Sequence, residues 1–361
     1  MNDHTLAAPL LQTKQHYEIL DGLRGVAAIS VVIFHFMEIA VPDYHVNWVA
    51  HTYLAVDFFF CLSGFVIAYA YDGRLPQLGL ASFVKLRLIR LHPLVIIGTV
   101  WGLVAFIFDP LNSLWIKYSG QPVLLFVTSC LMIPYAVVRE RYFNNFHLNP
   151  PVWSLFWEYV ANLVYAVVLV RVGKKLLWVL VVIGAVALVY EAHDATNLSV
   201  GWSGDNFWGG GVRAFFSFAA GILVYRSGYI IRSKVGFLIP AVLLVVTFLV
   251  PYVDRLNWIT ESFIVIFYFP LLLALGAGTM PGSRAHKLCV FFGEISYPLY
   301  MIHYPFIWLF MSYVETQKPT LMEMSLICAV GTLLLIALSY GVLVFIDAPV
   351  RRFLKRRLVG A

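Results

Sequence analysis

Charged residues are scarce in this chain of 361 residues: Asp, Glu, Lys and Arg together make up 12% of it, while 61% is hydrophobic. The mean hydropathy is +0.83. A soluble domain cannot bury so much apolar surface, so the composition excludes that class and indicates a polytopic membrane protein. No run of basic residues interleaved with aromatic ones occurs, and we expect no nucleic-acid partner.

Cysteine is also rare, and signatures that depend on it are missing. The four cysteines lie far apart, without C-x-x-C or His-paired spacing: Cys61, Cys130, Cys289 and Cys328. We therefore expect small core residues, with neither a disulfide nor a metal site. No signal-peptide pattern precedes the first apolar run, which is long enough to remain as a span. No internal repeat is visible, which disfavours an inverted-repeat transporter.

The apolar segments predict the fold. Eleven stretches are long and apolar: 20–41, 52–71, 91–109, 122–138, 151–170, 176–190, 210–225, 235–252, 259–279, 290–313 and 322–347. The fourth follows Gln121-Pro122 and is cut by Pro134, so we expect it to be re-entrant or peripheral. We predict an all-α polytopic membrane helix bundle of about ten transmembrane helices with that one additional short segment.

The positions of the basic residues predict the orientation. With ten spans, eighteen of the 25 Lys and Arg residues lie on the side of both termini, five lie on the other side and two lie within spans. The positive-inside rule then places both termini in the cytoplasm, and we expect a bacterial inner (plasma) membrane. The expected domains are a cytoplasmic tail at 1–18, a single membrane domain at 19–350 and a basic cytoplasmic tail at 351–361.

The first span carries two polar side chains on one face. Arg24 and His35 are eleven residues apart, which on an α-helix brings them within roughly 20° of one face and about 16 Å apart along the axis. Asp21, three residues before Arg24, can pair with it. Ionisable groups inside a membrane are costly, which favours a functional site. Alternatively, Arg24 reaches the lipid headgroups and His35 bonds a neighbouring helix.

His35 lies beyond the middle of its span, where an imidazole can act as a general base on a hydroxyl. Glu38, one turn later, either orients it or marks the outer interface. Trp153 and Ser154 open the fifth span, with Glu158 four residues after Ser154 on the same face. In the ten-span topology Glu158 has the depth of His35, so we expect it to fix the tautomer of the histidine and stabilise the imidazolium.

Three further segments place polar side chains in or beside spans. Asp57 stands six residues into the second stretch, followed by Ser63-Gly64, and forms either part of a site or an interfacial carboxylate with a packing notch. Ser296, Tyr297, Tyr300 and His303 lie in the tenth stretch, three of them at i, i+4 and i+7. They indicate an inward polar stripe or, alternatively, hydroxyls that satisfy a proline kink.

The loop before the third span is basic. Lys85, Arg87 and Arg90 lie there, with the two arginines one turn apart on a short helix. Such a pair can bind phosphates, as a cytosolic coenzyme A would require, although orientation charge and binding of anionic lipids explain the same residues. The outer loop at 191–209 lacks Lys and Arg and contains Trp202 and Trp208, which suit either a polar acceptor or interfacial anchoring.

These segments together resemble the integral-membrane acyltransferases of acyltransferase family 3. The resemblance runs from Leu20 to about Lys355 and rests on motifs in the expected order. They read Leu-Asp-Gly-Leu-Arg24-Gly with His35 eleven residues on, Asp57-Phe-Phe-Phe-Cys-Leu-Ser-Gly-Phe, Arg87-Leu-Ile-Arg90-Leu-His-Pro, Trp153-Ser-Leu-Phe-Trp-Glu158 and Ser296-Tyr-Pro-Leu-Tyr-Met-Ile-His303. Two departures are mild: His92 replaces a common tyrosine, and Asp347-Ala-Pro349 replaces Glu-x-Pro.

The resemblance implies O-acylation by a stand-alone membrane domain. Such proteins move an acyl group, often acetyl, from cytosolic acyl-coenzyme A to a hydroxyl, commonly of a cell-surface carbohydrate, and hold no permanent cofactor. We expect His35, Glu158 and Arg24 to be catalytic and Lys85, Arg87 and Arg90 to bind the donor. The acceptor pocket is then expected to include Asp57, Ser63, Trp153, Ser154, Ser296, Tyr297, Tyr300 and His303. The alternative is a transporter or flippase of a lipid-linked or acylated glycan. Membrane lipids are expected partners, and the sequence leaves the oligomeric state open.

Overall fold

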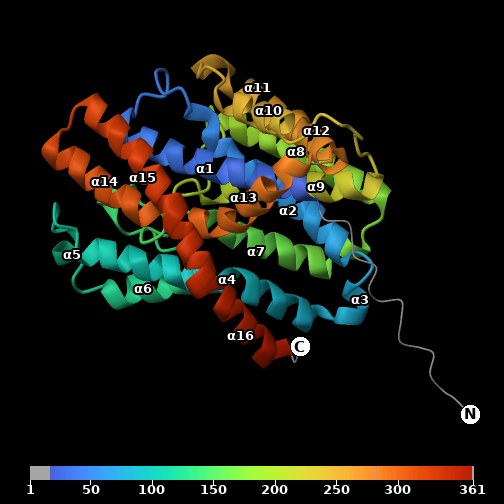
Figure 1. Ribbon diagram of the computed structural model, residues 1–361, viewed down its shortest axis with the longest axis horizontal. Coiled ribbons are helices and arrows are strands. Elements are labelled where there is room, and N and C mark those ends of the chain that lie inside the picture. The colour runs from blue at the N-terminus through green and yellow to red at the C-terminus, as the bar shows by residue number, and fades with distance from the viewer. Residues whose placement is uncertain (1–16, 281, 360–361) are drawn as a thin grey trace, which may run out of the picture.

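The protein is an all-helical bundle in the computed structural model, which describes residues 17–280 and 282–359 (Figure 1). Within those residues no β-strand occurs, and two isolated β-bridges join Asn144 to Ser203 and Ser233 to Thr279. This confirms the all-α part of the predicted fold class. The expected tail, as far as residue 16, and residues 360–361 lie outside the described part of the chain.

Helical elements fill most of the described chain. In order they are α1 (Glu18–Ala40), η1 (Ala50–Leu54), α2 (Ala55–Tyr71), α3 (Leu75–Leu78), α4 (Leu80–Ile107), α5 (Leu114–Lys117), α6 (Pro122–Cys130), η2 (Arg139–Arg141), α7 (Val152–Val167), η3 (Leu169–Arg171), α8 (Lys174–Asp194), α9 (Phe207–Ser227), α10 (Leu238–Phe248), α11 (Asp254–Phe263), η4 (Ile264–Tyr268), α12 (Phe269–Gly278), α13 (Ser283–Ile302), α14 (Tyr304–Gln317), α15 (Leu321–Val342), η5 (Leu343–Asp347) and α16 (Ala348–Val359). The segments η4 and η5 are π-helical turns within longer helices.

Seven helical segments of the described chain are long and apolar enough to cross a membrane: Glu18–Ala40, Ala50–Tyr71, Leu80–Ile107, Lys174–Asp194, Phe207–Ser227, Asp254–Gly278 and Leu321–Leu358. The count of ten is therefore not confirmed. The other expected spans contain shorter helices: α7 has 16 residues, α10 has 11, and the stretch at 290–313 breaks at His303 into α13 and α14. At about 1.5 Å per residue, α7 and α10 fall short of a hydrocarbon core of about 30 Å.

The fourth apolar stretch contains α6, which has nine residues and is much too short to cross. Its helix ends well before Pro134, and a largely irregular chain then runs as far as α7. A membrane protein can accommodate such backbone only where protein or water satisfies its polar groups. The expectation of a short segment here is consistent with the structure.

One local prediction was wrong. Arg87 and Arg90 lie within the long helix α4, not in a loop with a separate short helix. The helix continues through Pro93, although proline lacks the N–H that an interior turn uses. Because membrane helices tolerate an interior proline, its position does not mark a helix end here.

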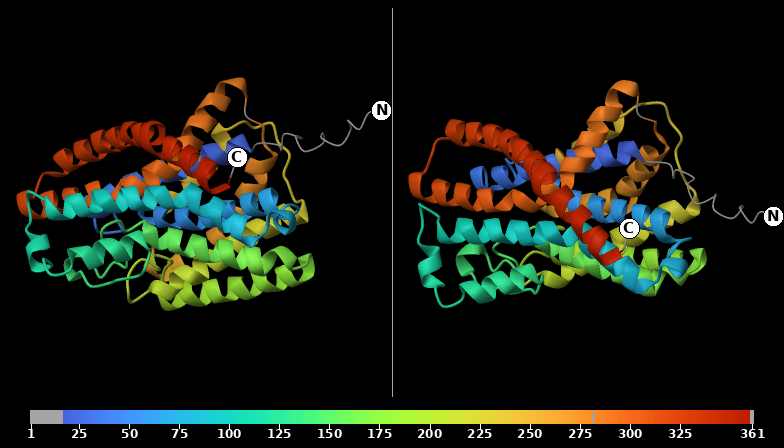
Figure 2. Two further views of the ribbon diagram at one scale, coloured as in Figure 1. Left: turned by 90° about the horizontal axis from the view of Figure 1, so that it is seen from below. Right: turned by 60° about the horizontal axis from the view of Figure 1, so that its bottom comes forward.

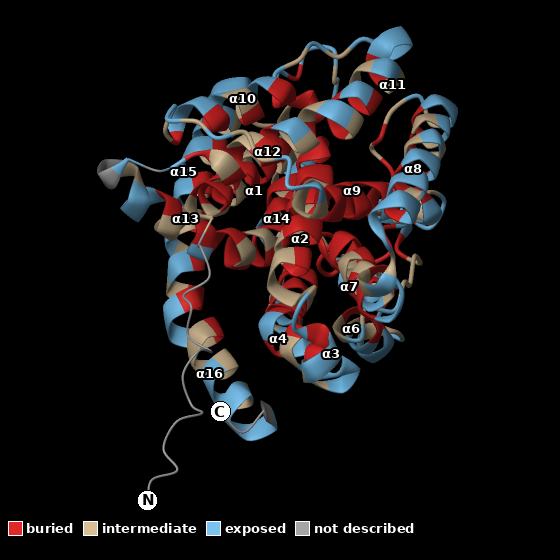
Figure 3. Cartoon of the chain, turned by 90° about the vertical axis from the view of Figure 1, so that its right-hand side faces the viewer, coloured by how far each residue is buried: buried red, intermediate tan, exposed pale blue. Residues whose placement is uncertain are grey.

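Close approaches between helices set the centre of the bundle. A Cβ on Gly64 of α2 would collide with the Phe218 carbonyl oxygen of α9, and one on Gly221 of α9 would collide with the Cys61 carbonyl oxygen of α2. The expected notch at Gly64 is thus confirmed. Figure 3 shows α2 and α9 buried in the middle, with α8 and α11 exposed at the rim. The exposed side chains of α8 include Trp178, Val182 and Val186, as lipid contact requires.

The C-terminal helix packs across the side of α4. The long helix that begins as α15 continues through η5 into α16, which packs against α4 (Figure 2). The described part of α16 is basic, with Arg351, Arg352, Lys355, Arg356 and Arg357. This contact brings residues near the end of the chain beside the arginines of α4.

Candidate functional site

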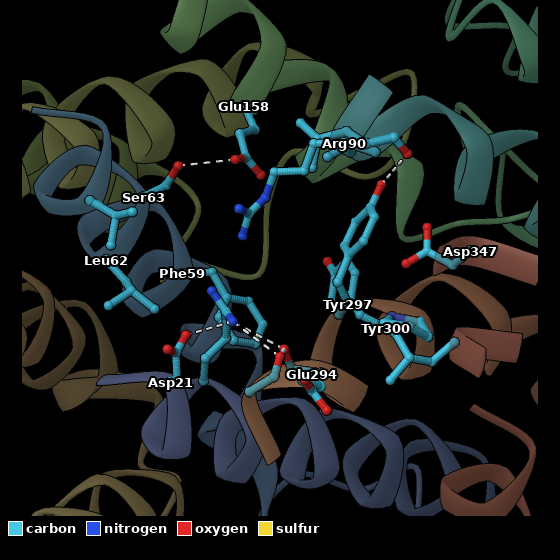
Figure 4. A pocket seen from close by; sticks show the side chains of 18 of the residues that line it. Asp21, Phe59, Leu62, Ser63, Arg90, Glu158, Glu294, Tyr297, Tyr300 and Asp347 are labelled. Atoms are coloured by element: carbon cyan, nitrogen blue, oxygen red, sulfur yellow. Dashed lines mark hydrogen bonds and ion pairs between the residues drawn. The ribbon is translucent and has the colours of Figure 1, made fainter. Parts of the chain in front are cut away.

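A cavity of about 900 Å³ opens among α1, α2, α4, α7, α13 and the junction of α15 with α16. Five arginines line it, and we call it the arginine cavity: Arg24, Arg87, Arg90, Arg351 and Arg352. Figure 4 shows Ser63 and Glu158 on one side of it and Tyr297, Tyr300 and Asp347 on the other. Its volume lies within the range of small-molecule sites.

Arg24 crosses from α1 to α13. Its guanidinium pairs with Asp21 at 2.7 Å and donates to the Ser296 hydroxyl at 2.9 Å and to the Gly293 carbonyl at 3.0 Å. The i, i+3 pairing with Asp21 was predicted from helix geometry and is confirmed. The pairing with α13 explains the position of Ser296 in the polar stripe.

Glu158 of α7 connects three helices. Its carboxylate accepts hydrogen bonds from Arg87 of α4 at 2.9 Å and from the Ser63 hydroxyl of α2 at 3.0 Å. The Arg87 side chain is 10% exposed and that of Glu158 is 23% exposed. Three of the expected site residues are therefore brought together in the arginine cavity, with Arg87 and Glu158 as an ion pair and Ser63 bonded to the same carboxylate.

The remaining cations of this cavity differ in how they are held. Arg351 pairs with Asp347 at 2.5 Å, whereas the exposed Arg90 has no ion pair among the described residues. Arg352, also exposed, hydrogen-bonds a backbone carbonyl of its own helix. Lys85 is exposed on α4 and does not line the cavity, in contrast to its expected role. Arg351 and Arg352 were missed because only the packing of α16 on α4 brings them here.

A second cavity, of about 360 Å³, contains His35 and is called the histidine cavity. The His35 Nδ1 lies 3.1 Å from the Glu38 carboxylate, which also accepts a hydrogen bond from the Tyr44 hydroxyl at 2.9 Å. The His35 ring stacks on that of His303 at 5.4 Å between centroids and meets the edge of Tyr304 at 4.7 Å. Of the two roles considered for Glu38, this contact supports the orienting one.

The expected contact between His35 and Glu158 is not present: the two side chains line different cavities. Equal depth in a bundle does not bring two helix faces together, and here Glu158 turns toward Arg87. The two cavities share Val56 and Tyr300 as lining residues. The Tyr300 hydroxyl lies 2.7 Å from the Ser154 hydroxyl, which holds the shared wall to α7.

His303 and Tyr297 support helix α13 from within. His303 is fully buried, with its Nδ1 2.9 Å from the Tyr300 carbonyl and 3.1 Å from the Leu299 carbonyl. An Nδ1 facing two carbonyls is a donor, so Nε2 carries the lone pair in the neutral ring. The Tyr297 hydroxyl donates to the Leu91 carbonyl of α4 at 2.5 Å. The predicted stripe exists, but His303 does not line either cavity.

Asp57 is the counter-ion of Arg213, a residue for which the sequence indicated no role. Arg213 of α9 donates to the Asp57 carboxylate at 2.6 Å, and both side chains are buried. Its guanidinium lies 5.3 Å from the Trp153 ring. Arg213 and Trp153 line the histidine cavity, whereas Asp57 does not. Trp202 of the 191–209 loop also lines this cavity, while Trp208 is 76% exposed.

A second missed arginine lines the histidine cavity. Arg141 ends the short helix η2 and is 1% exposed. Burial lowers its pKa to about 10, and burial together with Arg141 lowers the pKa of neighbouring His147 to about 3. No sequence motif surrounds Arg141, so only the tertiary structure reveals its position. The four cysteines are free, and the described residues contain no group of three metal-binding side chains.

The chain is similar in sequence to proteins of a known family. A family model described as an acyltransferase domain matches residues 17–346. Protein 2 in the picA locus of Rhizobium radiobacter is 34% identical over 190 residues, which are 50% of this chain and 96% of that protein. The O-acetyltransferase OatA of Staphylococcus aureus (strain NCTC 8325 / PS 47) is 27% identical over 360 residues, covering 92% of this chain.

The chain spans 57% of the length of OatA. No solved structure gives a significant match. The family match covers α1 to η5 and therefore both cavities almost completely. On this evidence the chain, an integral membrane protein by its apolar helices, belongs to the acyltransferase-3 family.

Proposed function

We propose that this protein moves an acyl group, most often acetyl, from cytosolic acyl-coenzyme A to a hydroxyl of a cell-surface or exported carbohydrate. The observation that carries the proposal is a pair of cavities, one lined by arginines and one containing a histidine–glutamate pair, that share Val56 and Tyr300. A phosphorylated thioester suits the first and a hydroxyl acceptor suits the second. The O-acetyltransferase name of the relative OatA supports the choice of acyl transfer.

The donor would lie in the arginine cavity. Coenzyme A carries several phosphates, and arginine binds phosphate oxygens through paired N–H groups. Arg90 and Arg352 suit this role because each is exposed and lines the cavity without an ion pair among described residues. Arg87 is already paired with Glu158, so we expect it both to stabilise the cavity wall and to contact the donor. Because α16 is basic, we place this end of the bundle in the cytoplasm.

The chemical step would occur at the shared wall. With Nδ1–H donating to Glu38, Nε2 of His35 is free to accept the proton of an acceptor hydroxyl. The hydroxyl oxygen forms a bond to the thioester carbonyl carbon, the carbon–sulfur bond breaks, and the proton passes from the imidazolium to the coenzyme A sulfur. Glu38, in place of Glu158, would stabilise the imidazolium in this scheme.

The test is acceptor-dependent release of coenzyme A by the purified protein in lipid nanodiscs, with acetyl-coenzyme A and a panel of oligosaccharides. We expect thiol release to rise with at least one carbohydrate and to be matched by ester formation in the product. Movement of glycan across a vesicle membrane without thiol release would contradict acyl transfer and favour the transporter. Trapping of an acylated side chain after rapid quenching would replace direct transfer with a two-step scheme.

A further inference from the structure

Arg141 is a buried cation that forms no ion pair within the described part of the chain. No carboxylate lies within ion-pair distance of it among the described residues, and its Nε has no hydrogen-bond partner. Its one described hydrogen bond runs from Nη1 to the His147 carbonyl at a long 3.5 Å. The guanidinium lies 4.6 Å from the Trp308 ring and 5.1 Å from the Phe106 ring. A buried charge without a counter-ion is costly, so the position indicates a role.

The backbone around Arg141 is held in a costly conformation. Tyr142 and Phe143, which follow it, have φ values of 57° and 50°, in the left-handed region that side chains other than glycine disfavour. Hydrogen bonds within the turn and one from the Gly204 N–H to the Phe143 carbonyl at 3.1 Å maintain this turn.

Two acidic groups near Arg141 are engaged with other partners, and a third, Glu315 of α14, is exposed and forms no ion pair with Arg141. Glu38, in the same cavity, is bonded to His35 and Tyr44. Asp109, buried nearby, accepts hydrogen bonds from the Ser312 hydroxyl at 2.6 Å and from the Leu111 N–H at 2.9 Å. The other arginine of the cavity, Arg213, is neutralised by Asp57. Arg141 is therefore the cation of this cavity that remains available to an incoming anion.

We propose that the histidine cavity accepts hydroxyl compounds that carry a carboxylate or phosphate group, and that Arg141 binds this group while His35 faces the hydroxyl. Tyr304 and Trp308 lie between the two side chains in the cavity lining: Tyr304 meets the His35 ring and stacks edge-on with Trp308, over which Arg141 lies. Such aromatic rings suit the apolar faces of a sugar ring. The inference rests on the proposed function and narrows its acceptor to acidic or phosphorylated carbohydrates.

The test compares matched acceptors in the coenzyme A release assay: a methyl glucoside, the corresponding methyl glucuronide and a glucose phosphate. We expect the wild-type kcat/KM to be about 10- to 100-fold higher for the charged acceptors, as hydrogen bonds to an ionised partner allow. Arg141→Gln should remove this preference for charged acceptors, and Arg141→Lys should retain part of it. Comparison of kcat/KM for the glucuronide and for the glucose phosphate shows which of the two anionic groups the cavity prefers.

The matched control is Arg139→Gln, which removes an exposed charge from the same short helix, away from both cavities, and should retain the preference. Equal losses for neutral and charged acceptors in Arg141→Gln would overturn the proposal, because an arginine that stabilised the reacting oxyanion would affect every acceptor. If Arg141→Gln fails to fold, competition in the wild type decides: the glucuronide must inhibit more strongly than the glucoside. Absence of thiol release with every acceptor would instead contradict the proposed function itself.

Discussion

The two cavities differ in the cations that form no ion pair among the described residues: the exposed Arg90 and Arg352 in the arginine cavity, and the buried Arg141 in the histidine cavity, where Asp57 neutralises Arg213. In the arginine cavity, Arg24 and Arg87 are tied to carboxylates and hydroxyls that include groups from other helices. In the histidine cavity, His35 pairs with Glu38 on its own helix, and Arg141 pairs with none of the described carboxylates. The first arrangement preorganises a wall before any ligand binds. The second leaves both a base and a charge for a ligand to complete.

The largest difference between the cavities should appear when their central side chains are removed. His35→Ala should lower acyl transfer by about 10²–10⁴-fold, the usual contribution of a general base, with no loss of folding. Glu38→Gln should have a smaller effect, because it retains a hydrogen bond to the ring and loses only the charge. Acceptor-dependent thiol release measures both. The matched control is His45→Ala, which removes an exposed imidazole outside both cavities. Wild-type turnover in His35→Ala would remove the general base from the proposal.

Arg87 and Arg90 sharpen the comparison within the arginine cavity. Arg87→Ala should lower the free energy of unfolding by about 1–3 kcal/mol, because it leaves the partly buried Glu158 carboxylate without its cation. Arg90→Ala should leave stability unchanged and raise the KM for acetyl-coenzyme A about tenfold, because it removes a phosphate contact made before the reaction.

Thermal unfolding in detergent and donor kinetics separate the effects of these two arginines. The double variant Arg87→Ala/Glu158→Ala should be more stable than Arg87→Ala, since it removes the unpaired charge. An unchanged donor KM in Arg90→Ala would exclude that residue from the donor site.

Tyr300 tests whether the two cavities act through a shared wall. Tyr300→Ala should join them, so that water from the histidine cavity reaches the thioester and acceptor-independent thiol release rises. Tyr300→Phe keeps the ring and loses only the bond to Ser154, and its effect should be small. The ratio of thiol released to ester formed measures how much of the thioester is hydrolysed without transfer to the acceptor. Tight coupling in both variants would mean that Tyr300 does not separate donor from acceptor.

The smallest effect is expected at the exposed Lys117–Glu140 pair, next to the turn that carries Arg141. The Lys117 ammonium lowers the pKa of Glu140 from its ordinary 4.5 to about 2. The pair therefore stabilises the folded state above about pH 4.5, and this contribution disappears as the pH falls toward 2. Glu140→Gln should melt slightly below the wild type at pH 7, and the difference should vanish near pH 2. A difference in melting temperature that persists near pH 2 would mean that packing, and not the ion pair, causes it.

The sequence predicted the helical class because apolar runs of 17 or more residues have few alternatives to a helix in lipid. It was less successful with the number of spans, because helices such as α13 and α14 are divided by a break at His303 that an apolar run does not reveal. The basic segment was placed in a loop because the third apolar stretch begins only at residue 91, although α4 already begins at Leu80. The number and the ends of helices depend on neighbours that satisfy the backbone.

Contacts between residues close in the sequence could be predicted, whereas contacts between distant segments could not. The contacts of Arg24 with Asp21 and of His35 with Glu38 could be anticipated, because three residues along an α-helix return a side chain to nearly the same face whatever the rest of the chain does. Only the packing of helices decided that Glu158 would face Arg87, and that Arg141 would share a cavity with His35. These contacts join segments far apart in the chain, and their geometry depends on where the small residues allow two helices to meet.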